Sequence, residues 1–153
     1  MEVGLRRLSN SAEMSPEDEK VFCEAAKIEF CQLREDWGDE VEEEAEPGDY
    51  LRDVIRDSEQ VYSLMRDDET VGVVALRTRA DQLKIEYLVV KQDCRRQGIG
   101  RQALRAIEIL ATEKGHSAVG LESIKKAEGF YKKAGYQKIP SGYCLTRFVK
   151  VLR

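Results

Sequence analysis

The sequence contains few of the residues that build metal sites or disulfide frameworks. Its single histidine is His116, which follows a predicted helix end, where a histidine is more often a surface residue than a catalyst. No C-x-x-C spacing connects its four cysteines, which are Cys23, Cys31, Cys94 and Cys144. This pattern argues against a zinc site and favours reduced thiols in a cytoplasmic setting. We therefore expect no metal centre.

Long apolar runs and some familiar motifs are also missing. No segment approaches the roughly eighteen apolar residues that span a membrane, and residues 1–10 lack the apolar centre of a signal peptide. The absence of G-x-x-x-x-G-K-[ST] excludes a nucleoside-triphosphate P-loop. A net charge of −4 argues mildly against general nucleic-acid affinity. We expect residues 1–153 to form one soluble domain with a sizeable core.

One long segment has no basic residue. The stretch from Glu35 to Asp49 lacks Lys and Arg, and it contains Glu40, Glu42, Glu43, Glu44 and Glu46. Two interpretations stay open, a solvated loop and a carboxylate-rich rim that attracts a cationic molecule. Pro47-Gly48-Asp49 then predicts a loop and a fresh helix start into residues 50–55.

Hydrophobic periodicity and turn residues predict both strands and helices. A helix start is indicated by Ser15, Pro16 and Asp18, and a further helix is expected over 99–114, with Gly115 as its end. Ser123 is expected to cap another helix over 124–134. The expected strands are 3–8, 61–65, 71–78, 83–90, 118–121, 136–139 and 143–151. Hairpins and crossovers occur together, so we expect an α/β (α+β) fold, a mixed sheet with helices on both faces.

The segment 88–101 carries the strongest functional signal. An apolar strand leads into a loop with arginines and two glycines, Gly98 and Gly100, which permit close backbone approach to a ligand. Free N–H groups and the helix dipole favour an anion at the helix start that follows. The spacing therefore predicts a diphosphate-binding loop, and a Gly-rich turn with a solvated basic rim is the alternative. A dinucleotide fingerprint with Ala103 at its third position also fits, but it does not include the basic cluster.

Two motifs in this half of the chain resemble those of the GCN5-related N-acetyltransferase (GNAT) superfamily. Arg95-x-x-Gly98-x-Gly100 is similar to its acetyl-CoA signature, [RQ]-x-x-G-x-[GA]. Residues 127–136 are similar to its A-x-x-[FL]-Y-x-x-x-G-[FY] segment. The resemblance extends from roughly residue 71 to the end of the chain. It departs from the family at Ile124, where many members have Asn, and after residue 90, where no Pro follows.

The resemblance implies a mostly antiparallel sheet with splayed central strands and acetyl-CoA as the acyl donor. In the family, the pantetheine arm pairs like an extra strand beside the strand that ends here at Val90, and the strand over 118–121 splays away from it. Backbone N–H groups of 97–101 and nearby arginines would hold the pyrophosphate. The implied cofactor-binding residues are Leu88, Val89, Val90, Arg95, Arg96, Gln97, Gly98, Ile99, Gly100 and Arg101.

Tyr131 matches the family's thiolate-protonating tyrosine, and an ordinary core aromatic is the alternative. Its phenol, with a pKa of about 10 in water, can donate a proton to a leaving thiolate. For the base we favour Glu86, which by simple alternation shares a strand face with Leu88 and Val90. Glu122 at the end of the next strand is the rival, and either carboxylate could equally be a surface charge.

The leading interpretation is therefore an N-acetyltransferase that acts on a primary amine, either a small molecule or a peptide. The acidic run favours an acceptor with additional positive charge. A non-catalytic acyl-CoA-binding regulator is the first alternative. An arginine-rich nucleic-acid contact is the second, and it ranks last in an acidic chain. No membrane partner is expected, and a homodimer stays open.

Overall fold

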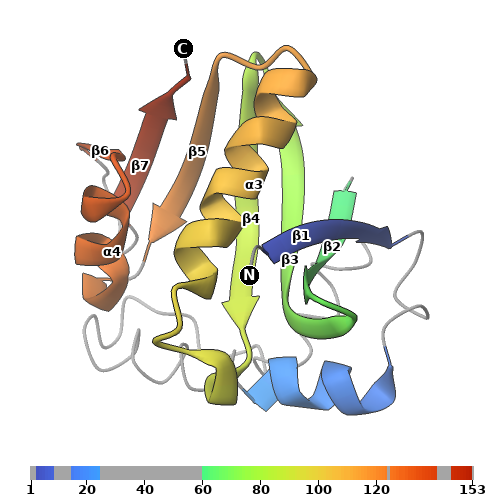
Figure 1. The fold of residues 1–153 in the computed structure, drawn as a ribbon. Helices are drawn as coiled ribbons and strands as arrows, with labels where there is room; N and C mark the ends of the chain where they lie inside the picture. Colours follow the sequence, from blue (N-terminus) through green and yellow to red (C-terminus); the bar gives the residue numbers. More distant parts are fainter. Residues whose placement is uncertain (1–2, 9–14, 25–59, 124, 141–145, 153) are drawn as a thin grey trace, which may run out of the picture.

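The computed structural model describes residues 3–8, 15–24, 60–123, 125–140 and 146–152. The acidic run and the helix expected over 50–55 lie outside these ranges. Within them, seven strands form one sheet in the order β1-β2-β3-β4-β5-β7-β6 (Figure 1). The strands are β1 (Val3–Leu8), β2 (Gln60–Arg66), β3 (Glu69–Arg79), β4 (Gln82–Val90), β5 (Ala118–Ser123), β6 (Gln137–Ile139) and β7 (Thr146–Val151). Neighbours in this sheet are antiparallel except β4 and β5, which are parallel.

Helices cover both faces of the sheet. The helix α3 (Ile99–Glu113) buries one apolar side, including Leu104 and Ile107, against one face. On the other face, Phe22 of the helical segment 16–24 packs with residues of β2, β3 and β4, among them Val73. The chain also forms the 3-10 turns η3 (Gln92–Cys94) and η4 (Lys125–Ala127) and the short helix α4 (Glu128–Lys133). The predicted mixed, mostly antiparallel sheet with helices on both faces is confirmed. None of the described helices is long and apolar enough to cross a membrane.

The helix start predicted at Ser15 is present and is tied to the end of β4. The Asp18 backbone N–H donates to the Ser15 hydroxyl oxygen at 3.1 Å, which satisfies one of the free amides of the first turn. The Asp18 carboxylate lies 2.8 Å from Nζ of Lys91, directly after β4. This hydrogen bond raises the pKa of Lys91 above its ordinary value, and desolvation opposes the rise. The ion pair between Asp18 and Lys91 thus connects the first helical turn to the end of β4.

Ser123 was predicted to cap a helix, and the structure places it at the end of a strand. Ser123 is buried at the end of β5, where it pairs with Thr146 of β7, so strand pairing takes the residue that was expected to start a helix. The helical region after it is shorter than predicted, because it consists of η4 and then α4, with Ala127 at the N-cap and no side-chain cap. At Gly129 inside α4 an added Cβ would meet no atom of the described part of the chain within 4 Å, so no neighbour there explains this glycine.

Candidate active site

The two central strands separate next to the glycine loop. The strands β4 and β5 pair from Gln82 and Ala118 as far as Ile85 and Leu121, and no further. Beyond that point β4 continues to Val90 and stays paired with β3, while β5 stays paired with β7 (Figure 1). The edge of β4 that faces β5 is therefore not paired by β5 over residues 86–90. A strand-like ligand can bind such an edge through backbone hydrogen bonds.

The loop between β4 and α3 has the backbone geometry of an anion site. Arg96 has a φ of 65° and Gly98 a φ of 76°, and both values lie in the left-handed region. Left-handed turns of this kind direct backbone N–H groups into a concave surface. Gly98 is also the N-cap of α3, where no side chain caps the helix and no acidic residue lies in the first turn. The positive end of the helix dipole is thus open to an anion.

Arginines surround this loop, and one of them was not predicted. The three expected arginines, Arg95, Arg96 and Arg101, are all exposed. Arg66 at the end of β2 donates through Nη1 to Oε1 of Gln97 at 2.6 Å. Gln97 in turn donates to the Asp93 carbonyl at 3.3 Å, which fixes the loop internally. Nothing in the local pattern marked Arg66, since only the fold brings the β2–β3 hairpin beside the loop.

Different features of the structure restrict the residue type at Gly100 and at Gly98. A Cβ at Gly100 would lie 3.1 Å from Cζ of Phe130, so the ring of this α4 residue covers the first turn of α3. At Gly98 the added Cβ would meet no atom of the described residues within 4 Å, and the positive φ restricts the residue. A side chain at Gly100 would therefore crowd Phe130, whereas a side chain at Gly98 would meet backbone strain alone.

The prediction that Glu86 shares a strand face with Leu88 and Val90 is wrong. A β-bulge interrupts the β3–β4 register at this position: Leu76 pairs with Ile85 and Ala75 pairs with Tyr87, which leaves Glu86 as the extra residue. Leu88 and Val90 pack on the α3 side of the sheet. Glu86 instead lies 3.2 Å from Nε of Arg77, on the opposite side.

Glu122 occupies the matching position on the neighbouring strand. Ile85 and Leu121 are the last pair between β4 and β5, so Glu86 and Glu122 are the next residues of their strands. Glu122 lies 3.4 Å from Nζ of Lys84, also on the side away from α3. Both carboxylates therefore flank the point where the strands part, and each one is held by a cation. Their placement does not favour one over the other as the base.

Tyr131 lies on the other side of the same point. Its ring contacts Phe148 of β7 with the centroids 5.8 Å apart, and it belongs to the apolar cluster beneath α3. Phe148 pairs with Leu121, which pairs with Ile85, so these three residues form a row across the sheet at the last β4–β5 pair. The candidate proton donor and the two candidate bases thus lie on opposite faces of the sheet, where its central strands separate.

A polar network connects this region to α3. Glu108 of α3 lies 2.7 Å from Nζ of Lys150 on β7, and it accepts a hydrogen bond from the hydroxyl of Tyr136 at 3.2 Å. Burial first, and then the negative charge of Glu108, raise the pKa of the Tyr136 phenol far above its usual range. The backbone N–H of Tyr136 donates to the Tyr131 carbonyl at 3.0 Å. The network therefore fixes the end of α4 and the backbone of Tyr131.

Solved structures of known acetyltransferases share this fold. PaiA N-acetyltransferase from Thermoplasma acidophilum, solved in complex with coenzyme A, superposes with a TM-score of 0.68 over 99% of this chain and 100% of that one, at 18% identity. An acetyltransferase from Bacillus cereus ATCC 14579 is 31% identical over 60% of this chain and 71% of that one, with a TM-score of 0.53. The chain therefore has the fold of these acetyltransferases.

Sequence comparison gives the family. The acetyltransferase (GNAT) domain matches residues 13–147, and the chain belongs to this family. The uncharacterized protein YyaT of Bacillus subtilis (strain 168) is 27% identical over 85 residues, which are 56% of this chain and 57% of YyaT. The match thus spans little more than half the length of this curated relative.

Proposed function

We propose that this chain is an N-acetyltransferase that transfers the acetyl group of acetyl-CoA directly to a primary amine. The observation that carries the proposal is the separation of β4 and β5 beside an anion-binding loop, since it offers an open strand edge next to a diphosphate cradle. The coenzyme A in the PaiA relative supports the choice of donor. The cytoplasmic location and the single domain expected from the sequence stay predictions.

In this proposal the donor lies along β4 and ends at the start of α3. Backbone groups of Leu88, Val89 and Val90 bind the pantetheine arm, and the N–H groups of residues 97–101, which include Ile99, bind the pyrophosphate. Exposed guanidinium groups of Arg95, Arg96 and Arg101 add positive charge around it, and Arg66 keeps Gln97 in place. Bound acetyl-CoA supplies the thioester that is attacked.

In this proposal the two proton transfers take place on opposite faces of the sheet. Glu86, directly or through a water, removes a proton from the ammonium group on the side away from α3. Glu122 is the rival for this role. On the α3 side, Tyr131 donates its phenolic proton to the departing thiolate. The amine and the thioester therefore meet where Ile85 and Leu121 end the β4–β5 pairing, with acid and base on opposite sides.

The acceptor in this proposal carries positive charge beyond the reacting amine. The support is the acidic run between Glu35 and Asp49, which has no Lys or Arg to neutralise it. Such a run concentrates cations and speeds their encounter, and salt weakens the effect. A polyamine, an aminoglycoside or a basic peptide fits this chemistry.

Thiol release from acetyl-CoA with a panel of amines tests the proposal. We expect release with cationic amines, and we expect KM for the acceptor to rise with salt. Changing Glu40, Glu42, Glu43, Glu44 and Glu46 together to Gln should raise that KM and weaken its salt dependence, with kcat kept. Binding of acetyl-CoA without turnover of any amine would instead support an acyl-CoA-binding regulator. If the kinetics respond to neither salt nor the substitutions, the alternative interpretation of the acidic run as a solvated loop is favoured.

A further inference from the structure

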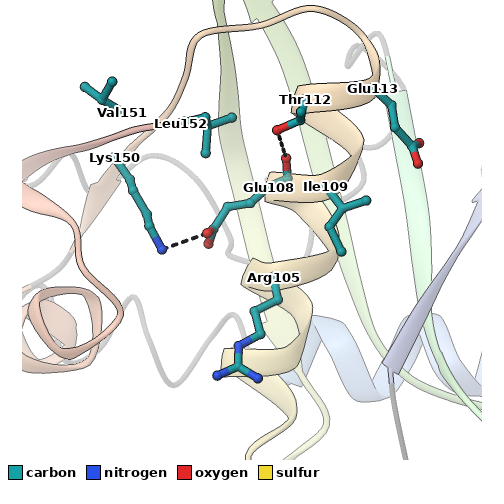
Figure 2. A pocket seen from close by; sticks show the side chains of 8 residues that line it. All are labelled: Arg105, Glu108, Ile109, Thr112, Glu113, Lys150, Val151 and Leu152. Carbon is teal, nitrogen blue, oxygen red and sulfur yellow. Dashed lines mark hydrogen bonds and ion pairs between the residues drawn. The ribbon is translucent and has the colours of Figure 1, made fainter.

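A groove of about 650 Å³ lies along α3 and the end of β7, away from the glycine loop. Its lining residues come from the middle and C-terminal turns of α3, from the last residues of β7 and from Leu152 directly after it (Figure 2). They are Arg105, Glu108, Ile109, Thr112, Glu113, Lys150, Val151 and Leu152. None of them belongs to the proposed cofactor or catalytic residues, so the groove is a separate surface.

The groove gathers exposed apolar side chains. Ile109 is 61% exposed and Val151 is 68% exposed. Among the described residues only three large hydrophobic side chains are exposed, and two of them line this groove; Phe130 is the third. Single exposed apolar residues are ordinary, whereas these two line one groove that charged residues also line, a setting compatible with a protein–protein contact.

The charges beside Ile109 have a self-complementary arrangement. Arg105, Ile109 and Glu113 are spaced by four residues, so they form one row on the outer side of α3 (Figure 2). Arg105 and Glu113 are exposed, and neither makes an ion pair within the part of the chain that the structure describes. Glu108 and Lys150 pair with each other and are already neutralised.

We propose that this row is the contact surface for a second copy of the chain, with a two-fold axis at Ile109. Each residue rises about 1.5 Å along a helix, so Arg105 and Glu113 lie about 6 Å to either side of Ile109. When two copies cross with opposite helix directions, Arg105 of each faces Glu113 of the other. A parallel crossing would bring like charges together. Two-fold dimers are also the commonest oligomers.

Sedimentation equilibrium of the full chain over a wide concentration range tests the surface. We expect a reversible dimer with a dissociation constant in roughly the micromolar range, because the patch is small. Ile109→Asp should weaken the dimer on the order of a hundredfold or more, since both copies lose their central apolar anchor. Ile109 is largely exposed, so the thermal unfolding midpoint of this variant should stay close to that of the wild type.

Charge reversal tests the two-fold arrangement. Arg105→Glu and Glu113→Arg should each weaken self-association, because two attractive contacts become repulsive in each dimer. An equimolar mixture of the two variants should associate again, since the copy with two acidic groups then faces the copy with two basic groups. The double variant should also recover. Arg79→Glu, at an exposed position on β3, is the matched control and should behave as the wild type.

Each other outcome contradicts the proposal. A wild-type chain that stays monomeric at the highest concentration, or an Ile109→Asp chain that dimerises like the wild type, overturns this surface. Weakening by both single reversals without recovery in the mixture overturns the two-fold axis at Ile109. These measurements need no substrate, so they stand or fall independently of the proposed acetyl transfer.

Discussion

Two glycines at opposite ends of α3 allow a matched test of the proposed phosphate cradle. Gly98 precedes the helix with a φ of 76°, and Gly115 follows it with a φ of 81°. At neither position would an added Cβ meet an atom within 4 Å among the residues that the structure describes. Alanine therefore fits sterically at both sites and meets the same backbone strain, about 1–2 kcal/mol in the left-handed region. The two substitutions should thus cost nearly equal stability.

The expected effect on unfolding follows from this strain. For a domain of this size, 1 kcal/mol lowers the midpoint by about 2–4 °C, so Gly98→Ala and Gly115→Ala should both melt about 2–8 °C below the wild type. Only Gly98→Ala places a methyl group where the pyrophosphate would approach the backbone. Isothermal titration calorimetry with acetyl-CoA at fixed salt should therefore show an affinity loss on the order of tenfold or more for Gly98→Ala. For Gly115→Ala the affinity should not change.

Two outcomes would refute this reasoning. If Gly98→Ala binds acetyl-CoA as tightly as the wild type while its unfolding midpoint falls, the phosphates do not approach Gly98 and the cradle is misplaced. If Gly115→Ala loses the same affinity as Gly98→Ala, binding responds to the stability of α3 rather than to the loop. Gly100→Val is a poorer probe, since its side chain would also meet Phe130.

Three further predictions address the chemistry and the anchored helix. Tyr131→Phe should lower kcat on the order of tenfold or more with acetyl-CoA affinity kept; wild-type turnover would return Tyr131 to a packing role. Glu86→Gln should flatten the acidic limb of the kcat/KM profile and lower its plateau, whereas an unchanged profile together with an impaired Glu122→Gln variant would assign the base to Glu122. The pKa of Lys91 is raised by Asp18, so the stability that this pair contributes is fully present below the unfolded lysine pKa of about 10.4 and is lost as the pH rises through the folded value. The difference in unfolding midpoint between the wild type and Asp18→Asn should therefore be constant from pH 7 to 9 and shrink above about pH 10.5, and a gap that persists there would show that the pair is not its source.

The order and type of the described elements could be predicted because their signals are local. Alternation within strands and the apolar side of α3 need no tertiary information. The start of α3 at Ile99 was predicted, and its last residue differs by one from the prediction, since Lys114 is the C-cap. The two left-handed glycines mark both ends of this helix. Most of the described strand boundaries lie within two residues of the predicted ones, which is within the ordinary uncertainty of such limits.

Pairings that arise only in the folded sheet could not be predicted. The end of β5 at Ser123 depends on pairing with Thr146, and the local sequence of a Ser before an apolar residue is equally typical of a helix cap. Arg66 reaches Gln97 only because the β2–β3 hairpin lies beside the loop. The bulge at Glu86 has no glycine to mark it, and the register of β3 alone reveals it.

This bulge is also what allows β4 to serve both faces of the proposed site. With unbroken alternation, Glu86 would share its face with Leu88 and Val90. Either the carboxylate would then enter the apolar cluster beneath α3, where an unpaired charge is costly, or the two apolar side chains would leave it. The extra residue turns Leu88 and Val90 toward α3 and leaves Glu86 beside Arg77 on the opposite face. On β4, the apolar side chains of Leu88 and Val90 can therefore follow a carboxylate that faces away from α3 only because this strand is irregular at Glu86.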